Sequence, residues 1–209
     1  MTEKEKKNLD KINIITLGNS IVGKTSFIVR FAENVFRPDY LATIGIDFRA
    51  KTVELPNKKV YKVYFYDTAG QEKYKSISLN SIKNTNGVLL MYDVTNRKSF
   101  ESISGWMQSI LSEKGKDFPL ILIGNKIDLE NERVVKKEEG EKLAKDYEVS
   151  FMETSNQTGQ NIQESVIALV SKIHEIKKKE TKEETEIYNS SYKLQTKKHK
   201  NEKKKNKCC

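Results

Sequence analysis

Residues 18–25 read Gly-Asn-Ser-Ile-Val-Gly-Lys-Thr, which fits the pattern G-x-x-x-x-G-K-[ST]. The apolar stretch KINIITL at 11–17 precedes this octapeptide, and a helical pattern follows it from Lys24 to about Glu33. Glycines at 18 and 23 allow the backbone to curl, so that successive N–H groups point at phosphate oxygens beside the positive end of the helix dipole. The stretch therefore predicts a loop that binds the phosphates of a nucleoside triphosphate.

Two side chains of this loop carry specific chemistry. Lys24 can reach the β and γ phosphates, and the Thr25 hydroxyl can ligate Mg²⁺, a hard ion that accepts oxygen ligands. A plain glycine turn with an exposed lysine is a poor alternative, because the flanking strand and helix are those that the motif requires. The residues expected to contact the nucleotide here are Gly18, Asn19, Ser20, Ile21, Val22, Gly23, Lys24, Thr25 and Ser26.

Short apolar runs alternate with helical patterns from Lys11 to about Ile176. Runs such as VLLMY and LILI are apolar on both faces, as central parallel strands covered by helices must be. This predicts an α/β fold, a doubly wound, mostly parallel six-stranded sheet with helices on both faces and a ligand beyond the carboxyl ends of the strands. The predicted strands are 11–17, 46–55, 58–66, 87–93, 119–124 and 149–153, and the helices are 24–33, 100–111, 136–147 and 162–173, with Trp106 as a core residue.

A second motif, DTAG at 67–70, directly follows a predicted strand. There Asp67 can reach Mg²⁺ through a bound water, and the Gly70 N–H can approach the terminal phosphate. Gln71 is placed to orient an attacking water, and Thr43 can offer the metal a second hydroxyl. Each signal is weak alone, but their order behind a phosphate loop makes them strong evidence for triphosphate hydrolysis.

A third motif, Asn125-Lys126-Ile127-Asp128, follows the predicted strand 119–124. The Asp128 carboxylate only accepts hydrogen bonds, so it can take both the ring N–H and the exocyclic amine of guanine. Adenine lacks this donor pair and would leave the carboxylate unpaired, at a cost of about 2–5 kcal/mol. Asn125 can bridge the base and the loop backbone, and the stem of Lys126 can pack over the base plane. The motif therefore favours a guanine nucleotide.

The charge of the chain is concentrated at its C-terminal end. Residues 177–209 hold twelve lysines and five glutamates, a net charge of +7, which leaves +2 of the total +9 for residues 1–176. We expect a polar extension at 1–8, one domain at 9–176 and a disordered lysine-rich tail at 177–207. The tail lacks the interleaved aromatic residues that stacking on bases requires, so we expect no nucleic-acid partner. The charged N-terminus and the lack of a long apolar run predict a protein kept in the cytosol or nucleus.

The three motifs and their spacing resemble the Ras-like small GTPases, and most closely the Rab branch, over about residues 9–176. The resemblance implies a monomeric switch that binds GTP or GDP with Mg²⁺, hydrolyses GTP slowly, and acts on vesicle membranes. It also implies exchange factors, GTPase-activating proteins, effectors, and prenylation escort and dissociation-inhibitor proteins as partners. The Rab-like segments are GNSIVGKTSF, YLATIGIDF, YDTAGQEKY, GVLLMYDVTNRKSFE, GNKIDL and FMETS.

Further residues gain roles only from this resemblance. Phe36 matches the aromatic that stacks on guanine, Tyr40 the one that closes over the phosphates, and Ser155 with Asn156 the loop whose backbone meets the guanine oxygen. The terminal pair, Cys208 and Cys209, resembles the double-cysteine ending on which both thiols are geranylgeranylated. Two lipids and a lysine-rich tail would hold the protein on the cytoplasmic face of intracellular membranes, with a cytosolic pool.

Some positions depart from the Rab-like pattern. Ile21 occupies a site where a small residue is usual, so its branched side chain is expected to crowd the γ-phosphate or an incoming arginine. Asn156 and Gln157 stand where related sequences have alanine and lysine, with an expected effect on base packing. These departures keep open a second hypothesis, a slowly hydrolysing or nucleotide-locked domain that serves as a scaffold.

Overall fold

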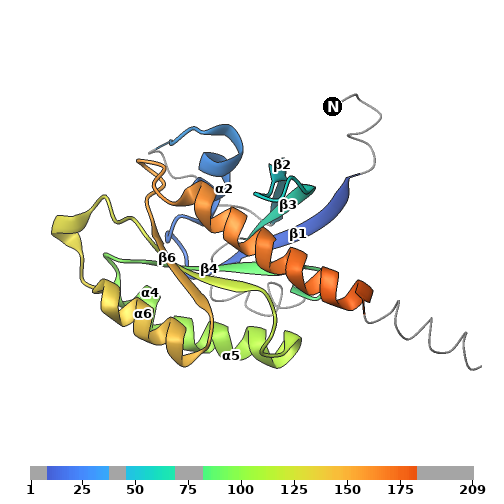
Figure 1. Ribbon diagram of the computed structural model, residues 1–209. Coiled ribbons are helices and arrows are strands. Elements are labelled where there is room, and N and C mark those ends of the chain that lie inside the picture. Colours follow the sequence, from blue (N-terminus) through green and yellow to red (C-terminus); the bar gives the residue numbers. More distant parts are fainter. Residues whose placement is uncertain (1–8, 38–45, 69–81, 183–209) are drawn as a thin grey trace, which may run out of the picture. The chain divides into compact units, whose positions relative to one another are not determined.

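The computed structural model describes residues 9–37, 46–68 and 82–182. The described residues belong to two units, one ending at Ser171 and one beginning at Lys172. The second unit is helical from its start to residue 182. The first unit contains the sheet and the residues of the site described below (Figure 1).

The first unit is built on a six-stranded sheet with the order β2-β3-β1-β4-β5-β6. Strands β2 and β3 pair antiparallel, and every other neighbouring pair is parallel. The turn between β2 and β3 lies between the predicted strands 46–55 and 58–66, where the Lys58 N–H donates to Leu55 O at 2.9 Å. The predicted mostly parallel sheet is confirmed, and its strands are β1 (Asp10–Leu17), β2 (Ile46–Glu54), β3 (Val60–Thr68), β4 (Gly87–Asp93), β5 (Leu120–Asn125) and β6 (Ser150–Thr154).

Helices cover both faces of this sheet, as predicted. Helix α2 (Lys24–Glu33) packs against β2 and β3, whereas α5 (Ile103–Lys114) and α6 (Lys137–Asp146) lie on the other side, against β4, β5 and β6 (Figure 1). Every residue of β4 and β5 is buried, which is why their sequences are apolar on both faces. Trp106 is 5% exposed and belongs to this core.

The prediction of one helix over 100–111 is wrong in detail, because the chain forms α4 (Arg97–Glu101) and then α5. Asn96 caps α4 by accepting the Ser99 N–H at 3.2 Å. At the junction the Ser102 hydroxyl donates to Lys98 O at 2.8 Å, a bond that competes with regular helix hydrogen bonding.

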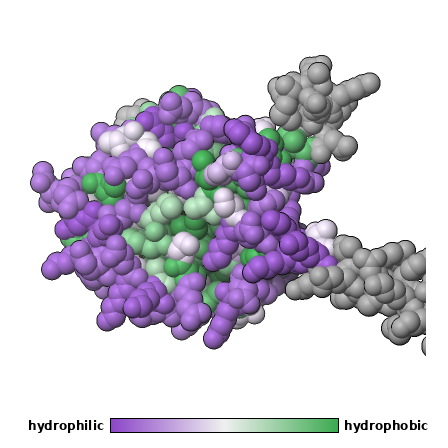
Figure 2. Space-filling view, viewed as in Figure 1, coloured by the Kyte–Doolittle hydropathy of each residue, from purple (hydrophilic) through white to green (hydrophobic). Residues whose placement is uncertain are grey.

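In the view of Figure 2, hydrophilic residues cover most of the surface and hydrophobic residues gather near its centre.

Candidate functional site

The loop between β1 and α2 requires glycine at both ends. Gly18 has a φ of +133°, and a Cβ there would lie 2.1 Å from the backbone oxygen of Met91 in β4. Gly23 has a φ of +97°, and a Cβ there would lie 2.5 Å from the Asn125 side-chain nitrogen. Both backbone conformations are rare for residues with a side chain. The loop therefore curls tightly against the carboxyl ends of β4 and β5, as the motif predicts.

Lys24 lies inside this loop and is 5% exposed. Its Nζ donates to Gly18 O at 2.9 Å and to Asn19 O at 2.8 Å. These bonds fix the ammonium group within the curl of the backbone, at the N-terminus of α2. A positive charge and a helix N-terminus are thus brought together, which is an arrangement suited to anions.

The Asn19 side chain points away from the loop toward helix α5. Its Nδ2 donates to the Ser102 hydroxyl at 2.9 Å, and its Oδ1 accepts the indole N–H of Trp106 at 3.1 Å. Any contact of Asn19 with a ligand therefore falls to its backbone. The sequence predicts Trp106 as a core residue, but no local pattern reveals this bond.

Ile21 has a φ of +66°, in the left-handed region that a β-branched residue seldom adopts. Its side chain is 61% exposed. Burial of the side chain therefore does little to offset the backbone strain. Ile21 thus differs from the Rab-like pattern in the size of its side chain, and its backbone also adopts a conformation that costs free energy.

Asn125 is fully buried and joins the 125–128 segment to the loop. Its Nδ2 donates to Val22 O at 2.8 Å, and its Oδ1 accepts the Thr154 hydroxyl at 3.1 Å. The predicted bridge to the loop backbone is present. The contact with Thr154 at the end of β6 was not predicted.

Asp128 is oriented by a serine from the loop after β6. The Ser155 hydroxyl donates to Asp128 Oδ1 at 2.5 Å, and it accepts the Thr158 N–H at 3.0 Å. The Ser155 N–H donates to Gln160 O at 3.2 Å, so it is already engaged within the loop. The backbone contact of residues 155 and 156 with guanine stays a prediction. Ser155 thus acts on the site through Asp128.

The Lys126 side chain is oriented by an ion pair with a residue at the end of β4. Its φ is +71°, and its Nζ lies 2.6 Å from Asp93 Oδ2 at the end of β4. Asp93 in turn accepts two hydrogen bonds from Thr95 through Oδ1. The charged end of Lys126 is anchored on the protein, which leaves the stem as the part that can cover a flat ligand.

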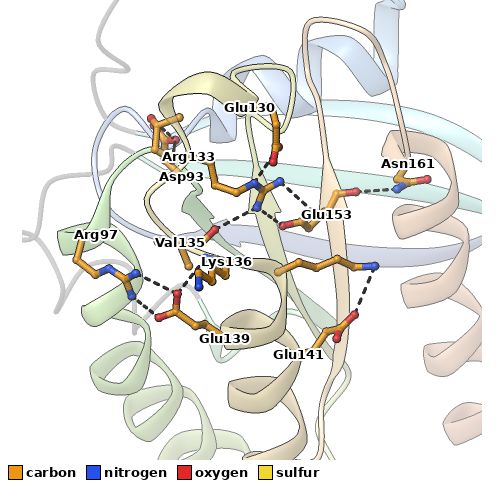
Figure 3. Close-up of polar contacts among 12 residues, drawn as sticks. Asp93, Arg97, Glu130, Arg133, Val135, Lys136, Glu139, Glu141, Glu153 and Asn161 are labelled. Atoms are coloured by element: carbon orange, nitrogen blue, oxygen red, sulfur yellow. Dashed lines mark hydrogen bonds and ion pairs between the residues drawn. The ribbon is translucent and has the colours of Figure 1, made fainter.

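An ion-pair network centred on Arg133 supports the segments that carry Asp128 and Ser155 (Figure 3). Arg133 donates to both carboxylate oxygens of Glu153, at 2.6 and 3.3 Å, and to Glu130 at 2.8 Å. The hydrogen bond to Glu153 is the main reason that the pKa of the Arg133 guanidinium is raised. Because Glu153 directly precedes Thr154 and Ser155, the network ties the segment after η2 (Glu130–Glu132) to the end of β6.

The phosphate loop, the 125–128 segment and the loop after β6 line an open pocket of about 250 Å³. One wall comes from the loop and α2, and the opposite wall from the segments after β5 and β6. Phe36 and the exposed Arg37 border it as well. The residues that line it are Ile21, Gly23, Ser26, Phe36, Arg37, Lys126, Asp128, Leu129, Asn156 and Gln157.

Oxygen donors suited to Mg²⁺ are also present. Thr25 lies in the first turn of α2, and Asp67, near the end of β3, is 3% exposed. Within residues 9–37, 46–68 and 82–182 no group of three or more His, Cys, Asp or Glu side chains could hold a metal. A Mg²⁺ ion that keeps waters and shares phosphate oxygens needs only one or two carboxylates, so this donor set fits it.

The expected contributions of Tyr40, Thr43, Gly70, Gln71, Cys208 and Cys209 lie outside the described residues.

The sequence of the whole site matches a known family. The family model described as the Ras family matches residues 13–175. The chain is a Ras-family small GTPase of the Rab group. The human "Ras-related protein Rab-8B" is 41% identical over 160 residues, which cover 77% of each chain. Rab-10 of Diplobatis ommata is 41% identical over 80% of this Rab and 84% of its own length, and Rab-13 of Bos taurus is 42% identical over 77% and 78%.

Membership in the group gives the predicted activity. This Rab is a GTPase, a switch between GTP and GDP forms that acts in vesicle trafficking. Ras-family GTPases bind these nucleotides generally with Mg²⁺ and interact with exchange factors, activating proteins and effectors. Among the described helices, none is long and apolar enough to cross a membrane.

Proposed function

We propose that the pocket between the phosphate loop and the 125–128 segment binds the guanine nucleotide of the switch. The observation that carries this proposal is that Gly23 of the phosphate loop, Asp128 of the 125–128 segment and Asn156 of the loop after β6 line one pocket. The phosphates would lie against the N–H groups of the loop and the Lys24 ammonium. The purine would lie between Phe36 and the stem of Lys126.

Asp128 is the group proposed to select guanine. The Ser155 hydroxyl takes one acceptor position on Asp128 Oδ1. An ionised carboxylate has about four such positions, so enough remain for the two N–H donors of guanine. Ser155 also fixes the carboxylate before the base arrives, which lowers the entropy cost of binding.

Hydrolysis would be in-line attack of water on the γ-phosphate. Gln71 would orient the water, while Lys24 and the loop N–H groups stabilise charge on the phosphate oxygens. Thr25, Thr43 and Asp67 would hold Mg²⁺, which when bound neutralises charge on the β and γ phosphates. Tyr40 would close over the phosphates, and the Gly70 N–H would meet the γ-phosphate.

The C-terminal end would attach the protein to membranes. Cys208 and Cys209 would carry two geranylgeranyl groups, delivered by a prenylation escort and shielded by a dissociation inhibitor. Two lipids are needed because one gives only marginal attachment, and the lysines would add attraction to anionic lipid. The protein would then be found on the cytoplasmic face of intracellular membranes and in a cytosolic pool. Mass spectrometry of the C-terminal peptide from eukaryotic cells tests the lipidation, and an unmodified peptide would contradict it.

The nucleotide itself gives the most direct test of the pocket. We expect the purified protein to carry GDP or GTP, and added GTP to lose its γ-phosphate slowly. In the Gln71→Leu variant, binding should persist and hydrolysis should fall sharply. Recovery of adenine nucleotide, or no nucleotide binding by calorimetry, would refute the proposal.

A swap of hydrogen-bonding groups tests the role of Asp128. In Asp128→Asn, an amide N–H donor replaces one acceptor oxygen, which suits the 2-oxo group of xanthine better than the 2-amino group of guanine. We expect GDP to bind at least ~100-fold more weakly and xanthosine diphosphate to bind more tightly than in the wild type. If both nucleotides keep their wild-type order, Asp128 does not read the base.

The position of Ile21 favours a second candidate function, a slowly hydrolysing scaffold. Its exposed branched side chain lines the pocket at a position where the Rab-like pattern has a small residue. Such a side chain would hinder an arginine supplied in trans, which is otherwise worth ~10³ to 10⁵ in rate. If activating proteins accelerate GTP hydrolysis by Ile21→Gly but not by the wild type, the scaffold hypothesis gains support.

A further inference from the structure

Asn156 lies in the loop after β6, and its side chain reaches across to the phosphate loop. It is 4% exposed and lines the nucleotide pocket. Its Nδ2 donates to the backbone oxygen of Gly23 at 2.9 Å, over a separation of 133 residues. Gly23 O also accepts the Phe27 N–H at 2.9 Å, the first hydrogen bond of α2.

This bond stands next to a similar one from Asn125. The Asn125 amide donates to Val22 O, so two amides from two different segments hold two consecutive carbonyls of the loop. A Cβ at Gly23 would lie 2.5 Å from Asn125 Nδ2 and 2.6 Å from Asn156 Nδ2. Both amides therefore pack directly on Gly23, which explains the lack of space for a side chain there.

The Asn156 side chain is an unfavourable choice for stability alone. Its Oδ1 is buried and has no hydrogen-bond partner among the described residues. An unsatisfied buried acceptor typically destabilises the fold, and the alanine of the Rab-like pattern would avoid the problem. Among the residues that the structure describes, the donation to Gly23 O is the hydrogen bond that explains the position of this amide.

We propose that Asn156 is a positioning residue, a latch between the base-binding loop and the phosphate loop that slows the release of the nucleotide. The proposal rests on the proposed function, because a nucleotide bound with its base at Asp128 and its phosphates at the loop spans the same two segments. The latch sets the distance between these segments before and during binding. Pre-organisation of this kind lowers the cost of binding and lengthens the residence time.

The test is the dissociation rate of fluorescently labelled GDP, displaced by excess unlabelled GDP in the presence of Mg²⁺. Loss of one hydrogen bond of ordinary strength predicts release ~2- to 10-fold faster from Asn156→Ala. Asn156→Asp keeps the size of the side chain but places a carboxylate oxygen against Gly23 O. This variant should release GDP at least as fast as Asn156→Ala.

Ser165→Ala provides the matched control. Ser165 is fully buried, and in the described part of the chain its hydroxyl donates within its own helical segment, to Asn161 O at 2.8 Å and Ile162 O at 3.0 Å. Its removal should lower the melting temperature without changing the rate of GDP release. The latch predicts the opposite pattern for Asn156→Ala, a faster release with little change in the melting temperature of the GDP-loaded protein.

Two results would overturn the latch. One is an unchanged release rate in both Asn156 variants, and the other is an equal acceleration in Ser165→Ala, which would indicate general loosening of the domain. Failure of the proposed function looks different, because then the wild-type protein would not retain labelled GDP at all.

Discussion

The indole nitrogen of Trp106 donates a hydrogen bond to Asn19 Oδ1 at 3.1 Å, which joins helix α5 to the second residue of the phosphate loop. The Asn19 amide completes the connection by donating to Ser102, at the junction of α4 and α5. The Asn19 side chain, which points away from the nucleotide pocket, thus anchors the loop to helices α4 and α5. The mobility of the loop should therefore depend on a residue that does not contact the nucleotide.

Replacing Trp106 tests this connection. Trp106→Phe keeps an aromatic ring in the core but removes the N–H donor, so we expect GDP release ~2- to 10-fold faster and a loss of about 1–2 kcal/mol in the free energy of unfolding. Stopped-flow release and urea denaturation measure the two effects. Met107→Leu, a conservative change in the same buried face of α5, should leave the release rate unchanged. Equal rates in Trp106→Phe and wild type would mean that the bond does not restrain the loop.

Ile21 offers a test of backbone strain in the loop. A left-handed conformation costs a branched residue roughly 1–2 kcal/mol, whereas glycine adopts it freely but loses about 0.5–1 kcal/mol through unfolded-chain entropy. We expect Ile21→Gly to raise the free energy of unfolding of the GDP-loaded protein by up to about 1 kcal/mol in urea titrations. Ile21→Val keeps the branched side chain and should match the wild type. A destabilised glycine variant would show that the Ile21 side chain makes compensating contacts.

Tyr92 places a hydroxyl in the core without a hydrogen-bond partner in the part of the chain that the structure describes. The residue is fully buried, and burial raises the pKa of its phenol. Tyr92→Phe removes the unsatisfied group and keeps the ring contact with Phe100, whose centroid is 5.0 Å away. We expect a gain of about 1 kcal/mol in the free energy of unfolding. Tyr92→Leu, which loses the ring contact, should be destabilised, and a destabilised Tyr92→Phe would reveal a buried water on the hydroxyl.

Glu139 should make stability depend on pH in acid. The Arg97 guanidinium, and after it the Lys136 N–H, lowers the pKa of the Glu139 carboxyl to about 2. Because this value lies below that of the unfolded chain, the contribution is complete above pH ~4.5 and is lost as the pH falls toward 2. The pair is half exposed, so the contribution should be under ~1 kcal/mol. Denaturation of Glu139→Gln at several pH values should give a flatter acid slope than the wild type, and an unchanged slope would contradict this role of Glu139.

Much of the site could be predicted because its signals are local. The spacing of Gly18, Gly23 and Lys24, set between an apolar strand and a helix, leaves few other conformations for the backbone. The apolar runs at 87–93 and 119–124 predicted buried parallel strands, and parallel strands bring their carboxyl ends, and the motifs that follow them, to one edge. The sequence alone therefore determined the fold class and the family, and it named most of the residues that line the pocket.

The connections between these motifs depended on tertiary structure. The contacts of Asn156 with Gly23 and of Trp106 with Asn19 join residues 133 and 87 positions apart. Each contact depends on the order of strands in the sheet and on where a side chain leaves its loop, which no periodicity or motif encodes. A hydrogen bond forms only when donor and acceptor meet within about 3 Å, and that distance is decided by the packing of the whole domain.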